Sequence, residues 1–281
     1  MQNNLVTQII SKALLLIRKK PVVVVLKMSG IIGQGSGLKS GLNLSSFDEK
    51  IESAFSSSNV QAVALIINSP GGSPVQSELI YNKIRNLSQE KKIMILSFVE
   101  DVAASGGFWL ACAGDKIYAA QNSVIGSIGV VSSGFGFYKV IEKLGIERRV
   151  YTQGKSKSIL DPFMPEKKDD IQILKQVQKD IYENFKDLVL SRRTNIEKKN
   201  HDEIFSGAFW SSKKAKELGL IDEIGNFHSV IREKFGKKIT IKKINSEKSW
   251  LKSLLGSAIG IVMDKLLSSL EERSIRSRYD L

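Results

Sequence analysis

Short apolar runs alternate with helical patterns through the first half of the chain. Continuous apolar runs predict buried strands at residues 22–28, 62–67 and 92–98, with a shorter one at 116–119. Apolar residues at helical spacing predict intervening helices at 47–56, 75–87 and 108–112. Strands that alternate with helices are typical of an α/β fold, in which a mostly parallel sheet carries helices on both faces.

The second half continues the alternation less regularly. The pattern predicts a helix at 138–144, a strand at 147–152 and a long helix opened by Pro165. A helical segment at 211–218 and a strand-like segment at 220–225 follow. The active site of such a fold is expected at the carboxyl ends of the strands.

Both ends of the chain carry amphipathic stripes outside this pattern. The stripes are formed by Leu5, Val6, Ile9, Ile10, Ala13, Leu14 and Ile17, and by Leu251, Leu254, Leu255, Ala258, Ile259, Val262, Leu266 and Leu270. Neither stripe predicts a signal peptide or a transmembrane helix, because charges interrupt them before the roughly 20 apolar residues that a span needs. They fit a membrane surface, or packing on the core or on a neighbouring subunit. We therefore divide the chain into an N-terminal segment (1–20), a catalytic domain (21–240) and a C-terminal helical tail (241–281).

Composition narrows the possible partners and cofactors. The net charge is +13, but basic residues are scattered among acidic ones without a recognition motif, so we expect no nucleic acid partner. The same charge would suit a protein that works near anionic lipid. The single cysteine, Cys112, excludes an internal disulfide and is expected in the core. Two isolated histidines and one cysteine offer no metal-ligand spacing, so we expect neither metal nor organic cofactor.

The small-residue stretch 101–107 is the strongest candidate for chemistry. It reads as a loop that presents one hydroxyl, Ser105, and then enters an apolar helix. A serine at a helix N-terminus lies among unpaired N–H groups, which an acyl-transfer enzyme needs to hold an oxyanion.

A serine nucleophile needs a base. His201 lies in a charged segment and His228 follows a turn, and neither has a catalytic setting. Lys155 and Lys157 stand in a small-residue loop. Lysine accepts a proton only when neutral, which ordinarily requires burial.

Residues 22–230 resemble the S49 family of serine peptidases, the signal peptide peptidase A family, which has a crotonase/ClpP-like fold. The resemblance rests on seven ordered motifs: Asn68-Ser-Pro-Gly-Gly72, Ala104-Ser-Gly-Gly107, Asp115-Lys-Ile-Tyr-Ala119, Gly126-Ser-Ile-Gly-Val130, Lys143-Leu-Gly-Ile146, Gly154-Lys-Ser-Lys157 and Gly219-Leu-Ile-Asp222.

The resemblance implies a role for each matching residue. Ser105 would be the nucleophile and Lys157, rather than Lys155, its base. Gly72 and Gly106 would supply the oxyanion N–H groups, and Ser127 would orient the lysine.

The resemblance also implies hydrophobic peptide substrates, such as signal-peptide or membrane-protein remnants, and a homo-oligomeric ring in which sites are shared between protomers. Because neither a signal peptide nor a membrane span is evident, we expect the chain in the cytoplasm or peripheral to the inner membrane. Two alternatives remain: an acyl-CoA enzyme of the crotonase type, which shares the oxyanion loops, and a membrane-peripheral scaffold without catalysis.

Overall fold

The computed structural model describes residues 21–33 and 41–244, so both terminal stripes lie outside the described residues. The described residues form an eight-stranded sheet with the main order β6-β5-β3-β2-β1-β8, and β4 and β7 continue from one edge of β3. Every pairing is parallel except that of β5 with β6. The expected α/β fold is confirmed.

The strands are β1 (Val22–Ser29), β2 (Val60–Ser69), β3 (Met94–Ala104), β4 (Lys116–Ala119), β5 (Val124–Gly126), β6 (Phe209–Ser211), β7 (Glu223–Ile224) and β8 (Thr240–Lys243). The helices are α2 (Leu44–Ser56), α3 (Pro74–Lys91), α4 (Gly106–Ala111), α5 (Tyr138–Lys143), α6 (Lys168–Arg192), α7 (His201–Ile204), α8 (Ser212–Glu217) and α9 (Phe227–Phe235). A short 3-10 helix, Lys198–Asn200, precedes α7.

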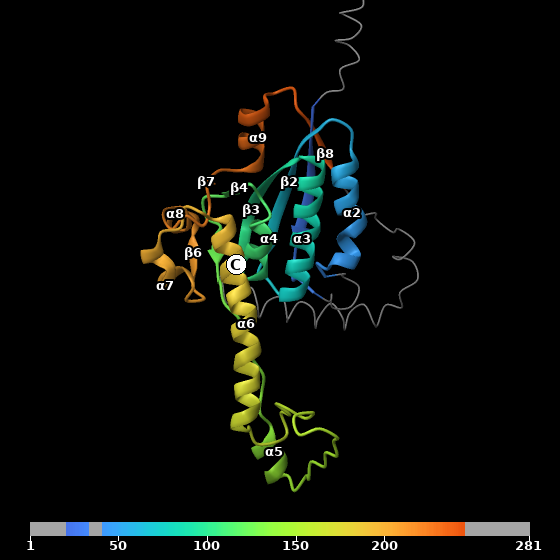
Figure 1. The fold of residues 1–281 in the computed structure, drawn as a ribbon, viewed down its shortest axis with the longest axis vertical. Coiled ribbons are helices and arrows are strands. Elements are labelled where there is room, and N and C mark those ends of the chain that lie inside the picture. The colour runs from blue at the N-terminus through green and yellow to red at the C-terminus, as the bar shows by residue number, and fades with distance from the viewer. Residues whose placement is uncertain (1–20, 34–40, 245–281) are drawn as a thin grey trace, which may run out of the picture.

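Both faces of the sheet are buried, as continuous apolar strands require. In β1, Val24 and Leu26 pack in the core that includes residues of α2, α3 and α4, whereas Val23 and Val25 pack on the face that α9 covers. Figure 1 shows α2, α3 and α4 side by side on one side of the sheet. Alternate side chains of one strand therefore reach two separate cores.

Strand β3 is longer than the sequence predicts. Its first part pairs with β4, and Val102–Ala104 pair with Val124–Gly126 of β5. Residues 101–104 are thus strand rather than loop, and the turn begins only at Ser105. Because β5 comes from about 20 residues further along the chain, no local sequence pattern predicts this pairing.

Helix α6 joins the body to a small projecting lobe (residues 131–167). Its C-terminal half is anchored: Phe185 stacks on Trp109 of α4 at 4.8 Å, and Arg192 donates to the carbonyl of Cys112 at 3.0 Å. Its N-terminal half runs out to the lobe that contains α5 (Figure 1). With 25 residues, the helix is about 37 Å long.

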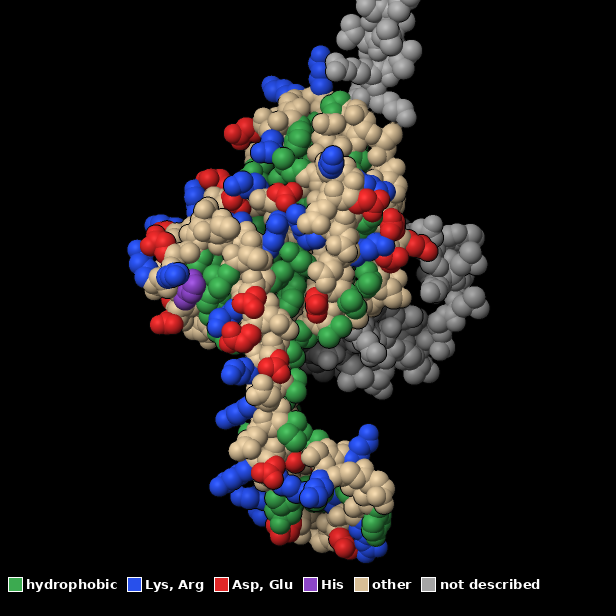
Figure 2. Space-filling view, viewed as in Figure 1, with side chains coloured by type: hydrophobic (Ala, Val, Ile, Leu, Met, Phe, Trp, Pro, Cys, Tyr) green, Lys and Arg blue, Asp and Glu red, His purple; other side chains and the backbone are tan. Residues whose placement is uncertain are grey.

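The lobe lacks the strand predicted at 147–152. That segment has no strand assignment, because it lies in the lobe, away from the sheet (Figure 1). The lobe is held by its own contacts, including a stack of Phe137 on Phe163 at 5.5 Å and an ion pair of Arg148 with Asp161 at 3.1 Å. Figure 2 shows apolar and basic side chains exposed side by side on it.

Candidate active site

Ser105 occupies a sharp turn between β3 and α4. Its backbone has φ 51° and ψ −123°, a conformation that non-glycine residues rarely adopt and that costs free energy. Backbone hydrogen bonds hold it on both sides: its N–H donates to the carbonyl of Gly126 at 2.8 Å, and its carbonyl accepts from the N–H groups of Phe108 at 2.9 Å and Trp109 at 3.1 Å. A serine on a strained strand-to-helix turn is the arrangement of a nucleophile elbow.

The segment after β2 passes directly against this turn. A Cβ built on Gly71 would lie 2.8 Å from the Cβ of Ser105, and one built on Gly106 would lie 3.5 Å from the amide nitrogen of Gly72. A Cβ on Gly72 would meet the carbonyl oxygen of Ile32 at 2.0 Å. Only glycine permits this close approach of the two backbones.

The close approach brings two amide groups to the serine. In the described part of the chain, the N–H groups of Gly72 and Gly106 donate to no other residue. Gly106 is the first residue of α4, and Gly72 precedes Ser73, the N-cap of α3. Two helix N-termini therefore direct positive potential at the region beside Ser105, which suits a developing oxyanion.

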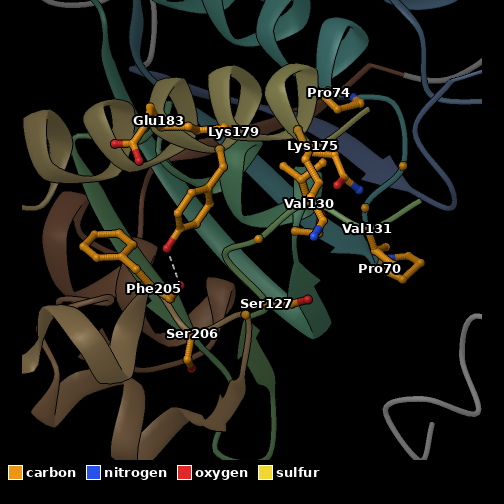
Figure 3. Close-up of a pocket in the computed structure, with 17 residues that line it drawn as sticks. Pro70, Pro74, Ser127, Val130, Val131, Lys175, Lys179, Glu183, Phe205 and Ser206 are labelled. Carbon is orange, nitrogen blue, oxygen red and sulfur yellow. Dashed lines mark hydrogen bonds between the residues drawn. The ribbon is translucent and has the colours of Figure 1, made fainter. Parts of the chain in front are cut away.

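Ser127 lies on the same cavity as Ser105. The cavity has a volume of about 800 Å³ and is lined by Ser105, Ser127, Gly72, Lys175, Lys179 and Tyr182, among others (Figure 3). Ser127 has φ 52°, and its N–H donates to Ala208 at 2.6 Å. The structure thus brings four of the five predicted site residues to one region: Ser105, Ser127, Gly72 and Gly106.

Lys157 is the exception. It is exposed, it belongs to the lobe, and it does not line the cavity that contains Ser105. Figure 1 shows the lobe at the far end of α6 from α4. Within one chain, the structure thus leaves the serine without the predicted lysine.

The structure also places the remaining candidate residues. Cys112 is fully buried, and burial raises the pKa of its thiol to about 12, so it is an unreactive core residue. Neither His201 nor His228 lines the cavity that contains Ser105. No group of metal ligands occurs among the described residues.

Helix α6 supplies a wall of the cavity that the sequence pattern does not predict. Lys175, Lys179 and Tyr182 lie on this wall, and the hydroxyl of Tyr182 donates to the carbonyl of Phe205 at 2.5 Å. The spacing of two lysines four residues apart was visible, but it could not show which surface α6 faces.

Two of the seven motifs have structural roles. Asp222 accepts hydrogen bonds from Arg193 at 2.7 Å, Lys116 at 2.8 Å and the amide of Ile117 at 2.8 Å. Asp115 accepts from Arg85 at 2.7 Å and from the amide of Ile95 at 2.9 Å. These carboxylates fix β4 to its neighbours rather than contribute to the cavity.

Comparison with known proteins agrees with this geometry. Residues 86–238, over half of the chain, match the model of peptidase family S49. The chain belongs to peptidase family S49. This S49 chain is 31% identical to "Serine protease SPPA, chloroplastic" of Arabidopsis thaliana, over 79% of the chain and 34% of that relative. It is 30% identical to "Protease 4" of Haemophilus influenzae, over 75% of the chain and 34% of that relative.

A third relative has a different name. "Na(+)/H(+) antiporter NhaA" of Brucella abortus (strain 2308) is 45% identical over 267 residues, which are 89% of the chain but 36% of that relative. An alignment that covers 89% of the chain must include the S49 segment. The S49 chain spans about a third of the length of all three relatives. No helix among its described residues is both long and apolar enough to cross a membrane.

Proposed function

We propose that the chain is a serine endopeptidase in which Ser105 of one protomer acts with Lys157 of a neighbouring copy. The observation that carries the proposal is the strained backbone of Ser105 beside the two available amides of Gly72 and Gly106. Family membership supports the same chemistry. The proposed substrates are hydrophobic peptides, such as signal-peptide or membrane-protein remnants.

The proposed reaction proceeds in two steps. Ser105 Oγ attacks the scissile carbonyl while neutral Lys157 accepts its proton, and the oxyanion forms against the N–H groups of Gly72 and Gly106. The lysine then donates that proton to the leaving amine. In the second step, water loses a proton to the lysine and attacks the acyl-enzyme. The bond from the acyl carbon to Ser105 Oγ then breaks, the lysine returns the proton to Ser105 Oγ, and the carboxyl product leaves. Ser127 orients the lysine amine.

A shared site is supported by the shape of the protomer. Lys157 stands on a lobe at the far end of α6, and the lobe exposes large apolar side chains. These are Val131, Phe135, Val140, Leu144, Ile146 and Tyr151, with exposed fractions from 54% to 91%. Exposed apolar patches of this kind mark interaction surfaces, and a second copy that covers the patch would also supply the lysine.

We further propose that the assembly works in the cytoplasm or at the surface of the inner membrane. The amphipathic stripes and the net charge of +13 support contact with anionic lipid. Sedimentation with anionic vesicles at low salt tests this, and the absence of any sedimentation would leave packing on the protein as the role of the stripes.

A fluorophosphonate probe tests the nucleophile directly. We expect the full chain to be labelled at Ser105, identified by mass spectrometry of the modified peptide, and Ser105→Ala to remain unlabelled. The acyl-CoA alternative predicts the opposite result, which is binding of CoA without labelling. The scaffold alternative predicts neither.

A further inference from the structure

The wall of the active-site cavity formed by α6 carries two lysines one helical turn apart. Lys175 and Lys179 are four residues apart, so they share one face of the helix. Both line the cavity that contains Ser105. Figure 3 shows Lys175, Lys179 and Glu183 in series along the helix beside the cavity.

These lysines have no counter-charge in the described part of the chain. No described carboxylate lies within ion-pair distance of either amine. Among the described residues that line the cavity, Glu183 is the single acidic one, and it pairs with Lys186 at 3.1 Å. The α6 wall therefore presents two positive charges to whatever occupies the cavity.

The rest of the lining is suited to a peptide with apolar character. It includes Pro70, Pro74, Val130, Val131 and Phe205. A bound peptide excludes water from such a surface, which strengthens an electrostatic contact at its edge. A peptide with a carboxylate near its cleavage site would complement both features.

We propose that Lys175 and Lys179 bind a carboxylate of the peptide substrate and so determine which peptides are cleaved. This inference rests on the proposed peptidase function. The carboxylate has two possible sources, an acidic side chain near the scissile bond or the free C-terminus of a short fragment. In either case the lysines are specificity residues, distinct from the base.

The test compares matched peptides with the assembled full-length protein. One pair differs only by aspartate against asparagine, scanned over the four positions on each side of the cleaved bond. The second pair differs only by a free against an amidated C-terminus. We expect one pair to show a kcat/KM ratio of about fivefold in favour of the carboxylate, and this ratio to fall as salt is raised. A preference within the first pair identifies an acidic side chain as the carboxylate that the lysines bind. A preference within the second pair identifies the free C-terminus.

Variants connect the ratio to the lysines. Lys175→Gln/Lys179→Gln is expected to reduce the ratio to about one. Lys168→Gln is the matched control, because Lys168 is exposed on the same helix but does not line the cavity. The proposal is overturned if the wild type cleaves the carboxylate and neutral peptides of both pairs with equal kcat/KM, or if the double variant still prefers the carboxylate peptide. It is also overturned if the double variant lowers kcat/KM for carboxylate and neutral peptides by the same factor.

A binding measurement separates this proposal from the peptidase proposal. Fluorescence anisotropy of labelled peptides on Ser105→Ala requires no turnover, and the same peptide pairs are expected to differ in Kd by a similar factor. Carboxylate-dependent binding without cleavage by the wild type would overturn the peptidase function and retain the lysine site. Cleavage without any preference for the carboxylate peptide would support the peptidase function and overturn the lysine site.

Discussion

Ser105 combines chemical and conformational roles at the scale of one residue. Ser105→Ala is expected to abolish peptide hydrolysis and leave the fold intact, because the hydroxyl donates to no other described residue.

Ser105→Gly should be equally inactive but more stable than Ser105→Ala by about 1 kcal/mol, because glycine tolerates φ 51° without strain. Urea unfolding at one protein concentration measures the difference. Hydrolysis by purified Ser105→Ala would remove the serine from the mechanism.

The two loop lysines provide a matched pair. Lys157→Ala is expected to be as inactive as Ser105→Ala, whereas Lys155→Ala should reduce kcat/KM mildly, since only Lys157 matches the motif. The double variant Ser105→Ala/Lys157→Ala should be no worse than either single variant, because members of one catalytic unit are not additive. An essential Lys155 with a dispensable Lys157 would show that the loop was aligned wrongly.

The pH profile follows from the same base. Only a neutral amine accepts the proton of Ser105, so kcat/KM is expected to rise with pH. Steady-state rates between pH 6 and about pH 9 measure the profile. A flat profile over this range, for a chain whose structure is unchanged, would contradict a lysine base.

The sequence could predict those site residues whose neighbours in space are also their neighbours in the chain. A small-residue run before an apolar helix was enough to single out Ser105, and Gly106 is its neighbour in the chain. Gly72 and Ser127 required the family resemblance, because they reach Ser105 through the register of β2 and β5 with β3. Lys175 and Lys179 were missed because a helical period does not show what the helix faces.

At the scale of elements, Asp222 joins β4 to the end of α6. Burial alone would raise its pKa, but hydrogen bonds from Lys116, Ile117 and Arg193 outweigh it and lower the pKa below its usual value. Arg193 is 5% exposed, so removing its partner leaves a buried charge. Asp222→Asn is therefore expected to lower the free energy of unfolding by about 3 kcal/mol near neutral pH.

The effect of Asp222 has a defined pH window. Because its folded pKa is lowered, its contribution is complete above the unfolded value of about 4 and is lost as pH falls through the folded value. The stability difference between wild type and Asp222→Asn should thus shrink at pH values below about 4. Chemical denaturation over a pH series measures it. A difference that stayed constant down to about pH 2 would contradict a charged Asp222 as its cause.

Helices and strands were predicted correctly where a local sequence pattern determines them. The prediction failed where a strand depends on a neighbouring strand that is distant in sequence. Strand β4 matched its predicted range of 116–119, since its apolar run is bounded by turn residues. The strand predicted at 147–152 is absent, although Val150 and Tyr151 favour strand, because a strand needs a neighbour to accept its hydrogen bonds. The pattern predicts a loop at the carboxyl end of β3 because the partner of that segment, β5, is distant in sequence.

At the scale of the whole molecule, the projecting lobe is the least predictable feature. Its helix was foreseen, but the projection of α6 away from the body depends on which half of α6 is anchored. The exposed lobe surface is expected to be an interface, so Leu144→Glu/Tyr151→Glu should dissociate the assembly. Light scattering after size exclusion measures the mass, and peptidase activity should fall with it.

A matched control makes the lobe prediction specific. Met94→Gln also changes an exposed apolar residue, but at the start of β3, the opposite end of that strand from Ser105. It should keep the mass and activity of the wild type. If the lobe variant kept the wild-type mass, the apolar surface would have another role.

The shared site predicts complementation between inactive proteins. When Ser105→Ala and Lys157→Ala exchange subunits, some neighbours combine an intact serine with an intact lysine. In a head-to-tail ring with random incorporation, an equal mixture should recover about one quarter of wild-type activity, and recovery should peak at that ratio. Replacing either partner with Ser105→Ala/Lys157→Ala is the control and should give none, because no neighbouring pair then holds both groups. Subunit exchange is followed separately by energy transfer between labelled protomers. Exchange without recovered activity would mean that Ser105 and Lys157 act within one chain, which would require the lobe to fold back along α6 onto the cavity.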